Sequence, residues 1–569
     1  MAQLLRKRLA RISDGVVKTD VLIVGSGGSA LTAALRVRSA GLSALVVEKS
    51  AKVGGTTTYS GGGHWIPNTH LHEGANDSPE EALEYMEAII GDAGPASSRE
   101  RKLAFLQNGP KMVKFLEDEG FRWRKTVGYP DYFPEQRGGK IGGRGVEPAM
   151  FDLNVLGPWK DRLNFNPTRP PFPVYTYELS KLVRAKSSWD GMFMAIRVFG
   201  LRQYPQILLG NSPCTLGVSM VGQLLYLNIE KGVSIWTESP MTDLVVKDGQ
   251  VTGAIVEKVG KKITIEASRG VILAAGGFAK NTEMRKKYQA SPITSDWTSV
   301  IPTDQGDAIS AALKIGAATA LMDAAWWGAA MVDPKSGQAF WCLYDRVLPH
   351  SIIVDQTAER FTNESQNYNS IGHALWKRNE VSPAIPSFLI LDSNHRDRYV
   401  LAGRLMPGHT PQEVLDSGFV TKAETIQELA EKLDLSASVL GETVKRFNGF
   451  VSSGVDKDFH RGESAYDSFM GDPSYSPNRN LGAIERGPFY AVKLWPGDLG
   501  TKGGILTDEY ARALKEDSDG GRQVIQGLYA VGNSSASVMG RTYAGPGATL
   551  GPALTFAYIA ANHIIKHDD

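Results

Sequence analysis

A tyrosine and a glycine late in the chain place two hydrogen-bond donors close together. The segment GRTYAGPGATLGP, at 540–552, carries Tyr543 just ahead of Gly-Pro-Gly. Pro546 has no amide N–H, so the first free backbone N–H after it belongs to Gly547, which has no side chain to shield it. The pattern raises the question of which ligand needs a phenol and a bare amide so near each other.

A glycine turn early in the chain predicts a dinucleotide site. The sequence TDVLIVGSGGSALTAALRVRSAGLSALVVEKS predicts a buried strand at 21–24, a helix at 29–41 and a second strand at 44–47. Gly25-x-Gly27-x-x-Ala30 lies between the first strand and the helix, where the backbone can approach a pyrophosphate. Glu48 ends the second strand, about 20 residues further on, where its carboxylate can accept from a ribose hydroxyl. The alternative is an ordinary tight turn between strand and helix.

A second glycine-rich segment, VGGTTTYSGGGHWIP at 53–67, predicts a loop. Its glycines are too dense for a helix or a packed strand, and such a loop suits a flat or phosphorylated group. His64 in this loop could be a ligand or a base. A lone histidine in a loop is more often structural, so both interpretations stay open.

The order of the glycine turns predicts an α/β fold that is split in sequence. Asp248-Gly249 predicts a hairpin turn, and strands ending in glycine turns are predicted at 270–281 and 527–540. The middle of the chain lacks these turns and is richer in Trp, Tyr and charge. We expect a Rossmann-like cofactor domain formed by 1–322 and 496–569, with an α+β domain inserted at 323–495.

One segment, 188–204, predicts a helix with an apolar stripe. The stripe consists of Trp189, Met192, Phe193, Ile196 and Phe199. The basic residues around it are Lys181, Arg184, Lys186, Arg197 and Arg202, against the single acid Asp190. Two interpretations fit this pattern: an amphipathic helix packed on the core, or a surface helix that dips into a membrane interface.

Composition restricts the function classes. A net charge of +1, with 62 Lys and Arg in no long basic run, argues against nucleic-acid binding. Cys214 and Cys342 form no CxxC, so neither a disulfide framework nor a metal site is predicted. Residues 1–20 lack a signal-peptide core, and no uncharged apolar run reaches about 18 residues. We expect a cytoplasmic protein, with possible peripheral contact at the inner face of the membrane.

Several motifs resemble those of a flavoprotein family that includes fumarate reductases, and specifically those of 3-ketosteroid Δ1-dehydrogenases. They are VGGTTTYSGGGHWIPN, AAGGF, PGDLGTKGGILTD, GLYAVGN and TYAGPGATLGPALTFAY, and the resemblance covers about 20–563. It implies an FAD-binding domain with an inserted catalytic domain. Flavoproteins with a covalent link use a histidine near Gly-Gly-Thr, whereas Thr56, Thr57 and Thr58 follow Gly55 here. We therefore expect FAD to be bound non-covalently.

The resemblance also implies which residues hold the cofactor. They are Gly25, Gly27, Gly28, Ser29, Ala30, Glu48, Lys49, Gly54, Gly55, Thr56, Thr57, Ser60, Gly61, Gly62, Ala275, Gly276, Gly277, Asp307, Gly532, Asn533, Ala548, Thr549 and Leu550.

The implied reaction is the 1,2-dehydrogenation of a 3-ketosteroid in steroid degradation. A hydride leaves carbon 1 for the flavin N5, and a proton leaves carbon 2. By resemblance, Tyr543 and the Gly547 amide grip the 3-keto oxygen, as an oxyanion hole does. Tyr368, in FTNESQNYNS, is the implied base, and Tyr132, in GYPDYFPE, is the phenol that favours its ionised form.

Further pocket residues are weaker expectations. Tyr344 and Tyr129 are candidates for lining the substrate pocket, and Trp326 and Trp327 could form its wall or belong to the core. Ala544 stands where relatives often carry proline, which should loosen the turn slightly. The expected partners are a 3-ketosteroid and an electron acceptor such as a quinone.

Rival functions remain at this point. One is a 3-ketosteroid dehydrogenase that acts at the 4,5 bond, and another is a fumarate-reductase-like enoate reductase. The second lacks support because Tyr543-Ala544 and DLGTKGG replace the residues that clamp carboxylates in those relatives. A non-catalytic flavin- or lipid-binding protein is the third alternative.

Overall fold

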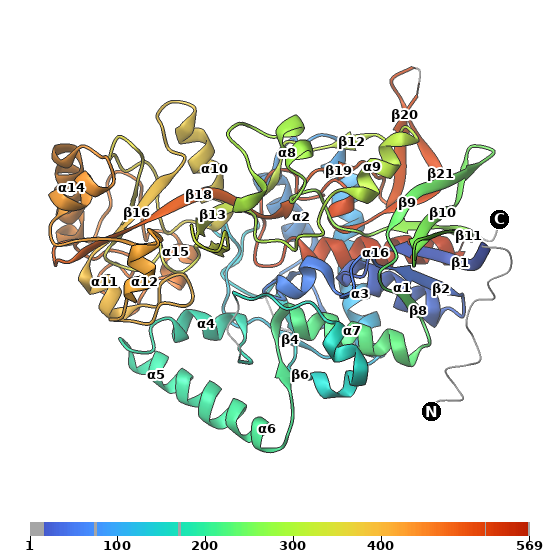
Figure 1. Cartoon of the computed structure of the whole chain (residues 1–569), viewed down its shortest axis with the longest axis horizontal. Helices are drawn as coiled ribbons and strands as arrows, with labels where there is room; N and C mark the ends of the chain where they lie inside the picture. The colour runs from blue at the N-terminus through green and yellow to red at the C-terminus, as the bar shows by residue number, and fades with distance from the viewer. Residues whose placement is uncertain (1–15, 73–76, 169–171, 518, 567–569) are drawn as a thin grey trace.

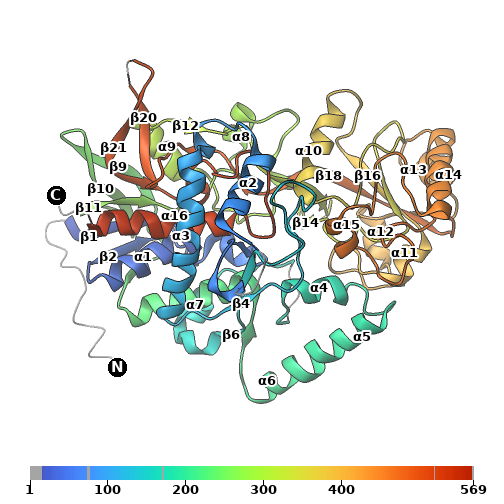
Figure 2. The ribbon, with the colours of Figure 1, turned by 180° about the vertical axis from the view of Figure 1, so that it is seen from behind.

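The computed structural model describes residues 16–72, 77–168, 172–517 and 519–566. The expectation about a signal peptide concerns residues 1–20, of which 1–15 lie outside the described residues. Figures 1 and 2 present the described chain from opposite sides, with the two larger sheets at opposite ends of the molecule.

Strands from both ends of the sequence form the larger sheet. Its order is β20-β21-β11-β1-β2-β8, and the β9–β10 hairpin adds to β11. The β1–β2, β1–β11, β2–β8 and β11–β21 pairs are parallel, whereas β20 and the hairpin pair antiparallel. The strands are β1 (Val16–Val24), β2 (Ala44–Val47), β8 (Ser234–Trp236), β9 (Met241–Lys247), β10 (Gln250–Lys258), β11 (Lys261–Leu273), β20 (Arg512–Glu516) and β21 (Arg522–Ala530). This topology confirms the predicted α/β cofactor fold that is discontinuous in sequence.

Helices cover the larger sheet where its central strands are apolar and buried, which is at 21–24 of β1, along all of β2 and at 271–273 of β11. On one side α1 (Gly28–Ser39) packs against both α7 (Leu216–Glu230) and α16 (Leu550–Lys566), and α16 packs on α3 (Arg99–Asp118). Phe278, α9 (Asp307–Lys314) and the hairpin join the core on the other side.

The smaller sheet lies in the inserted segment. Its order is β14-β13-β18-β16-β15, and β17 pairs with β18. The strands are β13 (Ala325–Val332), β14 (Ala339–Trp341), β15 (Ser351–Val354), β16 (Ser387–Leu391), β17 (Thr421–Ala423) and β18 (Phe489–Thr501). The helices around it are α10 (Tyr368–Asn379), α11 (Ser393–Arg398), α12 (Gln412–Asp416), α13 (Ile426–Lys432), α14 (Ala437–Ser453) and α15 (Ala465–Met470). The predicted boundary after Trp495 falls inside β18, which pairs with β16 and then with β13.

The remaining strands form three small sheets, β3-β5-β4, β6-β7 and β12-β19, and two further helices accompany them. They are β3 (His64–Trp65), α2 (Pro79–Ile90), β4 (Trp123–Lys125), β5 (Gly145–Pro148), β6 (Phe151–Asp152), β7 (Pro213–Cys214), α8 (Thr282–Tyr288), β12 (Thr319–Ala320) and β19 (Gly504–Ile505).

A helical segment, which we call the arm, extends below the body of the molecule in Figure 1. It comprises α4 (Thr176–Leu182), α5 (Trp189–Ala195), a π-helical stretch (Ile196–Gln203) and α6 (Tyr204–Leu208). The arm confirms the helix predicted at 188–204, but its apolar stripe is not packed on the core. Trp189 is 75% exposed and Phe193 63% exposed, so the amphipathic core helix was the wrong interpretation.

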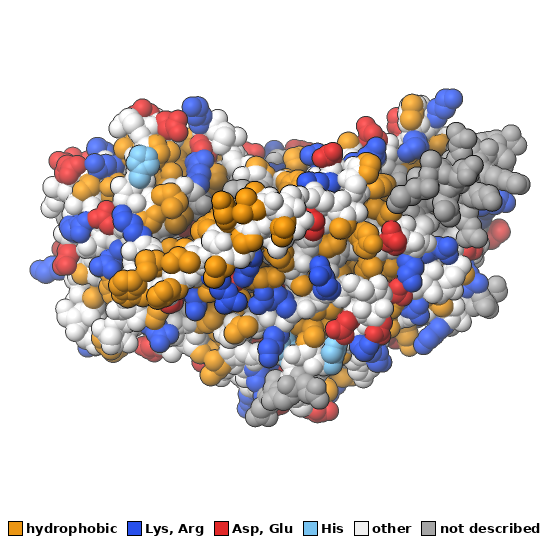
Figure 3. All heavy atoms as spheres, turned by 90° about the horizontal axis from the view of Figure 1, so that it is seen from below, with side chains coloured by type: hydrophobic (Ala, Val, Ile, Leu, Met, Phe, Trp, Pro, Cys, Tyr) orange, Lys and Arg blue, Asp and Glu red, His pale blue; other side chains and the backbone are white. Residues whose placement is uncertain are grey.

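Two of the basic residues predicted to border the stripe instead form ion pairs with acidic side chains. Arg202 forms a bidentate ion pair with buried Glu178, with both distances 2.6 Å. Buried Arg184 lies 3.5 Å from Asp190 and 3.6 Å from Asp472. The Arg202–Glu178 and Arg184–Asp190 pairs lie within the arm, whereas the Arg184–Asp472 pair joins the arm to the inserted segment. Seen from below, in Figure 3, hydrophobic side chains gather along the exposed side of this region with Lys and Arg beside them.

Candidate active site

The two N-terminal glycine loops are joined by hydrogen bonds around the start of α1. The Ser26 hydroxyl donates to Glu48 Oε2 (2.6 Å) and accepts from the Gly54 amide (3.0 Å). The Gly28 amide donates to Thr57 Oγ1 (3.0 Å). The loop at 53–57 is thereby held against the N-terminus of α1.

Close backbone approach makes glycine necessary at the first turn. Gly25 has φ +104°, and a Cβ there would lie 2.4 Å from the Ala274 carbonyl oxygen. Glu48 beside it is buried, and burial raises the pKa of its carboxyl despite hydrogen bonds from Ser26 and from the Ser50 amide (2.8 Å). A glycine cradle, a helix N-terminus and a buried carboxylate are the groups that hold the phosphates and ribose of a dinucleotide.

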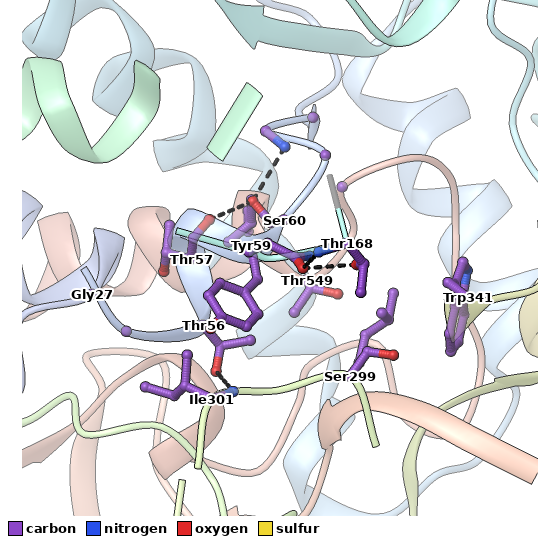
Figure 4. A pocket seen from close by; sticks show the side chains of 18 of the residues that line it. Gly27, Thr56, Thr57, Tyr59, Ser60, Thr168, Ser299, Ile301, Trp341 and Thr549 are labelled. Carbon is purple, nitrogen blue, oxygen red and sulfur yellow. Dashed lines mark hydrogen bonds between the residues drawn. The ribbon is translucent and has the colours of Figure 1, made fainter. Parts of the chain in front are cut away.

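One continuous cavity of about 990 Å³ connects these loops with the C-terminal tyrosine motif. Figure 4 looks into it, with Gly27, Thr56, Thr57 and Ser60 on one side and Trp341 at the other. The predicted cofactor residues that line it are Gly25, Gly27, Ser29, Glu48, Lys49, Gly55, Thr56, Thr57, Ser60, Gly61, Gly62, Ala275, Gly276, Asp307, Gly532, Asn533, Thr549 and Leu550. Gly28, Ala30, Gly54, Gly277 and Ala548 are not among the lining residues.

These five residues support the loops from behind. A Cβ at Gly28 would lie 2.3 Å from Met220, and one at Gly277 would lie 2.0 Å from the Thr501 hydroxyl. Ala30 and Ala548 are fully buried. Lys49 and Asp307, both at the lining, form an ion pair.

Three tyrosines that are far apart in sequence meet at the other end of the cavity. The ring centroids of Tyr132 and Tyr368 are 5.3 Å apart, and those of Tyr132 and Tyr543 are also 5.3 Å apart. All three side chains are buried yet line the cavity. The Asn367 amide donates to the Tyr132 carbonyl (3.3 Å), so the start of α10 is tied to the loop that carries Tyr132.

Tyr543 and Gly547 are arranged as a pair of donors. The Thr549 hydroxyl donates to the Tyr543 oxygen (2.8 Å), which leaves the phenol O–H to serve another acceptor. The Gly547 amide is near enough to this phenol to lower its pKa, although burial raises that pKa overall. Gly547 has φ +91°, and a Cβ there would lie 2.1 Å from the Gly63 carbonyl oxygen. No side chain fits at this position, so the Gly547 amide has no side chain beside it.

Burial dominates the titration of the candidate base. It raises the pKa of Tyr368 well above its ordinary value, while a hydrogen bond from Tyr132 lowers it. Burial likewise raises the pKa of Tyr132. The direction of the Tyr132 effect is the one predicted for a phenol that favours a neighbouring tyrosinate.

The weaker sequence candidates divide into two groups. Tyr129 and Tyr344 line the cavity, and burial raises the pKa of Tyr129 to about 12. Trp326 and Trp327 are absent from the lining, and the Trp326 ring packs behind Tyr543 with centroids 5.0 Å apart. His64 is fully buried and its ring contacts Trp123 at 5.0 Å, so it belongs to the core and not to the cavity wall.

Several residues of the site were not found from the sequence. Ser26, Trp341 and Arg404 line the cavity, and Tyr466 packs against Tyr132 with centroids 5.1 Å apart. Trp341 contacts Tyr368 edge to face at 5.3 Å. Only Ser26 carried a sequence signal, because it lies inside the first glycine turn. Arg404 pairs with Asp333 (2.9 Å) at the end of the cavity that the arm also lines.

Comparison with known proteins finds relatives that match nearly the whole chain. The family model described as FAD binding domain matches residues 20–550. The chain is 44% identical to the 3-oxosteroid 1-dehydrogenase of Mycolicibacterium smegmatis over 95% of this chain and 96% of that protein. It is 43% identical to the 3-oxosteroid 1-dehydrogenase of Mycobacterium tuberculosis, over 96% and 98%. The crystal structure of 3-ketosteroid delta1-dehydrogenase from Sterolibacterium denitrificans in complex with 1,4-androstadiene-3,17-dione superposes with a TM-score of 0.91 at 35% identity, covering 96% of this chain and 99% of that one.

Proposed function

This chain belongs to the FAD-binding flavoprotein family, among the 3-oxosteroid 1-dehydrogenases, and we propose that it removes hydrogen from carbons 1 and 2 of a 3-ketosteroid. The product of a 3-keto-4-ene substrate would be the 1,4-diene. The observation that carries the proposal is the meeting of Tyr543, Gly547 and the Tyr132–Tyr368 pair in the cavity that reaches the cofactor loops.

The Tyr543 hydroxyl and the Gly547 amide bind the 3-keto oxygen in this proposal. A proton on the carbon beside a ketone becomes acidic only when the charge that develops on the oxygen is met by preorganised donors. Thr549 holds the Tyr543 oxygen, and Gly63 packs against Gly547, so neither donor must reorganise.

Tyr368 accepts the proton from carbon 2. Its ring lies edge to face with that of Tyr543, so one steroid ring can touch both phenols. Tyr132 donates to Tyr368 and stabilises its ionised form, which burial alone disfavours. Bound FAD supplies the acceptor for the hydride that leaves carbon 1.

For the cofactor we assign the pyrophosphate to the N-terminus of α1 and the ribose to Glu48. Thr56, Thr57 and Ser60 on the second loop, and Thr549 and Leu550 at the start of α16, would flank the flavin. The geometry that supports this assignment is the Gly25 cradle and the Ser26–Glu48–Gly54 hydrogen bonds.

The division of the chain also remains a proposal. We assign the cofactor domain to 1–322 and 496–569 and the catalytic domain to 323–495, with β18 continuing across the second boundary.

A dicarboxylate reductase is disfavoured by the cations at the cavity. Among described lining residues these are Lys49 and Arg404, and each is paired with a carboxylate. Buried Arg285 pairs with Asp498 (2.7 Å) and does not line the cavity. A pair of arginines beside the tyrosines, which a dicarboxylate would need, is not found among these residues.

One anaerobic spectrum tests the function. Purified yellow protein mixed with a 3-keto-4-ene steroid should lose its flavin absorbance. Retention of the colour would contradict 1,2-dehydrogenation of this substrate. A 3-ketosteroid saturated at both the 1,2 and the 4,5 bonds, labelled with deuterium, separates the remaining alternatives: loss of deuterium from carbons 1 and 2 supports the proposed reaction, loss from carbons 4 and 5 supports 4,5-dehydrogenation, and retained colour supports a non-catalytic flavin-binding protein.

We also propose that the exposed arm touches an anionic membrane surface. Its apolar side chains extend beyond the predicted stripe to Leu201 (74% exposed) and Leu208, with Arg197 exposed beside them. Phe199 lies on the arm and at the cavity lining, so a lipophilic steroid could enter there. A quinone or a similar carrier would accept the electrons. No helix among the described residues is long and apolar enough to cross a bilayer.

A further inference from the structure

Tyr85 joins the two loops that carry Tyr132 and Tyr543. Its ring is fully buried on α2 and is not part of the cavity lining. Its hydroxyl donates to the Ala544 carbonyl (2.6 Å) and accepts from the Phe133 amide (3.2 Å). One phenol is therefore bonded to the residue that follows each of the two tyrosines.

The Ala544 carbonyl accepts a second hydrogen bond, from the Tyr132 amide (3.0 Å). Three hydrogen bonds thus connect the two loops directly or through Tyr85. Ala544 is fully buried, so water cannot replace a lost donor without entering the core.

Trp65 and Asp131 brace the same loops from behind. Asp131 accepts from Trp65 Nε1 (2.7 Å) and from Arg144 Nη1 (2.8 Å). The Trp65 ring packs so tightly on the Tyr543 loop that a Cβ at Gly545 would lie 2.5 Å from it. Tyr85 is the member of this group that bonds to both loops.

We propose that Tyr85 is a positioning residue that holds the Tyr543–Gly547 turn at its working distance from Tyr132 and Tyr368. This inference rests on the proposed function, because the distance matters only if one steroid ring must reach the donors and the base together. A displacement of about 1 Å in such a group can lower turnover about 100-fold.

Tyr85→Phe removes one oxygen atom and tests the proposal. We expect the protein to stay yellow and kcat to fall about 10- to 100-fold, with an almost unchanged dissociation constant for a 3-ketosteroid. Tyr529→Phe is the matched control, because it removes a phenol bonded to His563 (2.9 Å) away from the cavity lining. Equal kcat in wild type and Tyr85→Phe would overturn the proposal.

A double-mutant cycle separates positioning from a general structural role. If Tyr85 acts through Tyr543, then Tyr85→Phe should cost much less in a Tyr543→Phe background than in wild type. Losses that simply multiply would overturn the inference. If Tyr85→Phe does not fold, Trp65→Phe loosens the same turn from its other side, and the same cycle with Tyr543→Phe applies.

The tests distinguish a failure of the proposed function from a failure of the role assigned to Tyr85. If wild-type protein does not lose its flavin colour with any 3-ketosteroid, the function is wrong. If wild type reacts and the cycle shows no coupling, only the role of Tyr85 is wrong.

Discussion

The ring of Tyr368 meets the ring of Tyr543 edge to face, with centroids 5.1 Å apart and an interplanar angle of 77°. Tyr368 is the first residue of α10 in the inserted segment, whereas Tyr543 precedes α16. In the proposed reaction these phenols act on neighbouring atoms of one ring, carbon 2 and the oxygen on carbon 3. The proposed base, Tyr368, is therefore in direct contact with Tyr543, the proposed donor that makes the carbon 2 proton acidic.

Loss of the two phenols should have unequal effects. Tyr543→Phe should lower turnover about 10²–10³-fold, the usual cost of one oxyanion donor, because the Gly547 amide remains. Tyr368→Phe should be slower still, because the proposal assigns no other proton acceptor to carbon 2. The measurement is exchange of the carbon 2 hydrogen with deuterated water in enzyme that carries an inert flavin analogue. Exchange at the wild-type rate in Tyr368→Phe would show that another group is the base.

Tyr132→Phe should shift the pH dependence. Burial raises the pKa of Tyr368, and the hydrogen bond from Tyr132 lowers it, so removal of that bond should raise it further. Turnover that needs a tyrosinate rises with pH, and its rising limb should move to higher pH in the variant. A complete pH–rate profile of both proteins gives the result. An unmoved or acid-shifted limb would contradict the role of Tyr132.

Gly547→Ala should abolish most activity, whereas a matched glycine should tolerate the same change. A Cβ at Gly547 would overlap the backbone of Gly63 and His64, so the loop must move. Gly316 has φ +84°, and no atom lies within 4 Å of the place that a Cβ would take, so Gly316→Ala costs only backbone strain of about 1–2 kcal/mol. Steady-state turnover of both variants is the measurement. Equal, mild losses would mean that the loop adapts easily.

The free energy of unfolding should depend on pH through the carboxyl group of Asp131. Burial raises the pKa of its carboxyl to about 6, in spite of Arg144, whereas the unfolded value is near 3.8. Because the folded pKa is the higher one, the charged form costs stability above about pH 6. That cost, up to about 3 kcal/mol, disappears as the pH falls toward 4.

The Asp131→Asn variant lacks this titration. The melting temperature of wild type relative to the variant should therefore rise as the pH falls from 7 to 4. A difference that stays constant, or that falls, would contradict the raised pKa.

Exposed arm residues should control membrane binding. Trp189→Ser with Phe193→Ser should weaken binding to anionic vesicles, because the buried apolar area falls, and should spare turnover of a soluble steroid. Val259→Ser with Val381→Ser is the control, since both valines are exposed but lie outside the arm. Vesicle co-sedimentation is the assay. If the wild-type protein ignores anionic vesicles, the membrane proposal fails.

The features that could be predicted from the sequence are those set by residues close together in the chain. β2 has the bounds predicted for it, and Asp248 and Gly249 both have positive φ, as the predicted hairpin turn requires. These features depend on neighbours in the chain. The three tyrosines could be chosen from 19 only through motifs similar to those of a known family.

The remainder depends on contacts between distant residues. Tyr85 lies in none of the quoted motifs, and Asp131, although it lies in GYPDYFPE, carried no predicted role. Their bonds to Ala544 and Trp65 join separate parts of the chain. The exposure of the arm was also beyond prediction. An apolar stripe at helical spacing has the same sequence pattern whether a core or solvent faces it.

The packing of α1 on α16 has a consequence for biosynthesis. Arg36 on α1 donates to Asn562 on α16 (2.8 Å). The first helix of the cofactor fold therefore packs against the last helix described. During synthesis α1 lacks this partner until α16 has emerged from the ribosome. Flavin incorporation should therefore require α16, and nascent chains stalled before α16 should remain colourless.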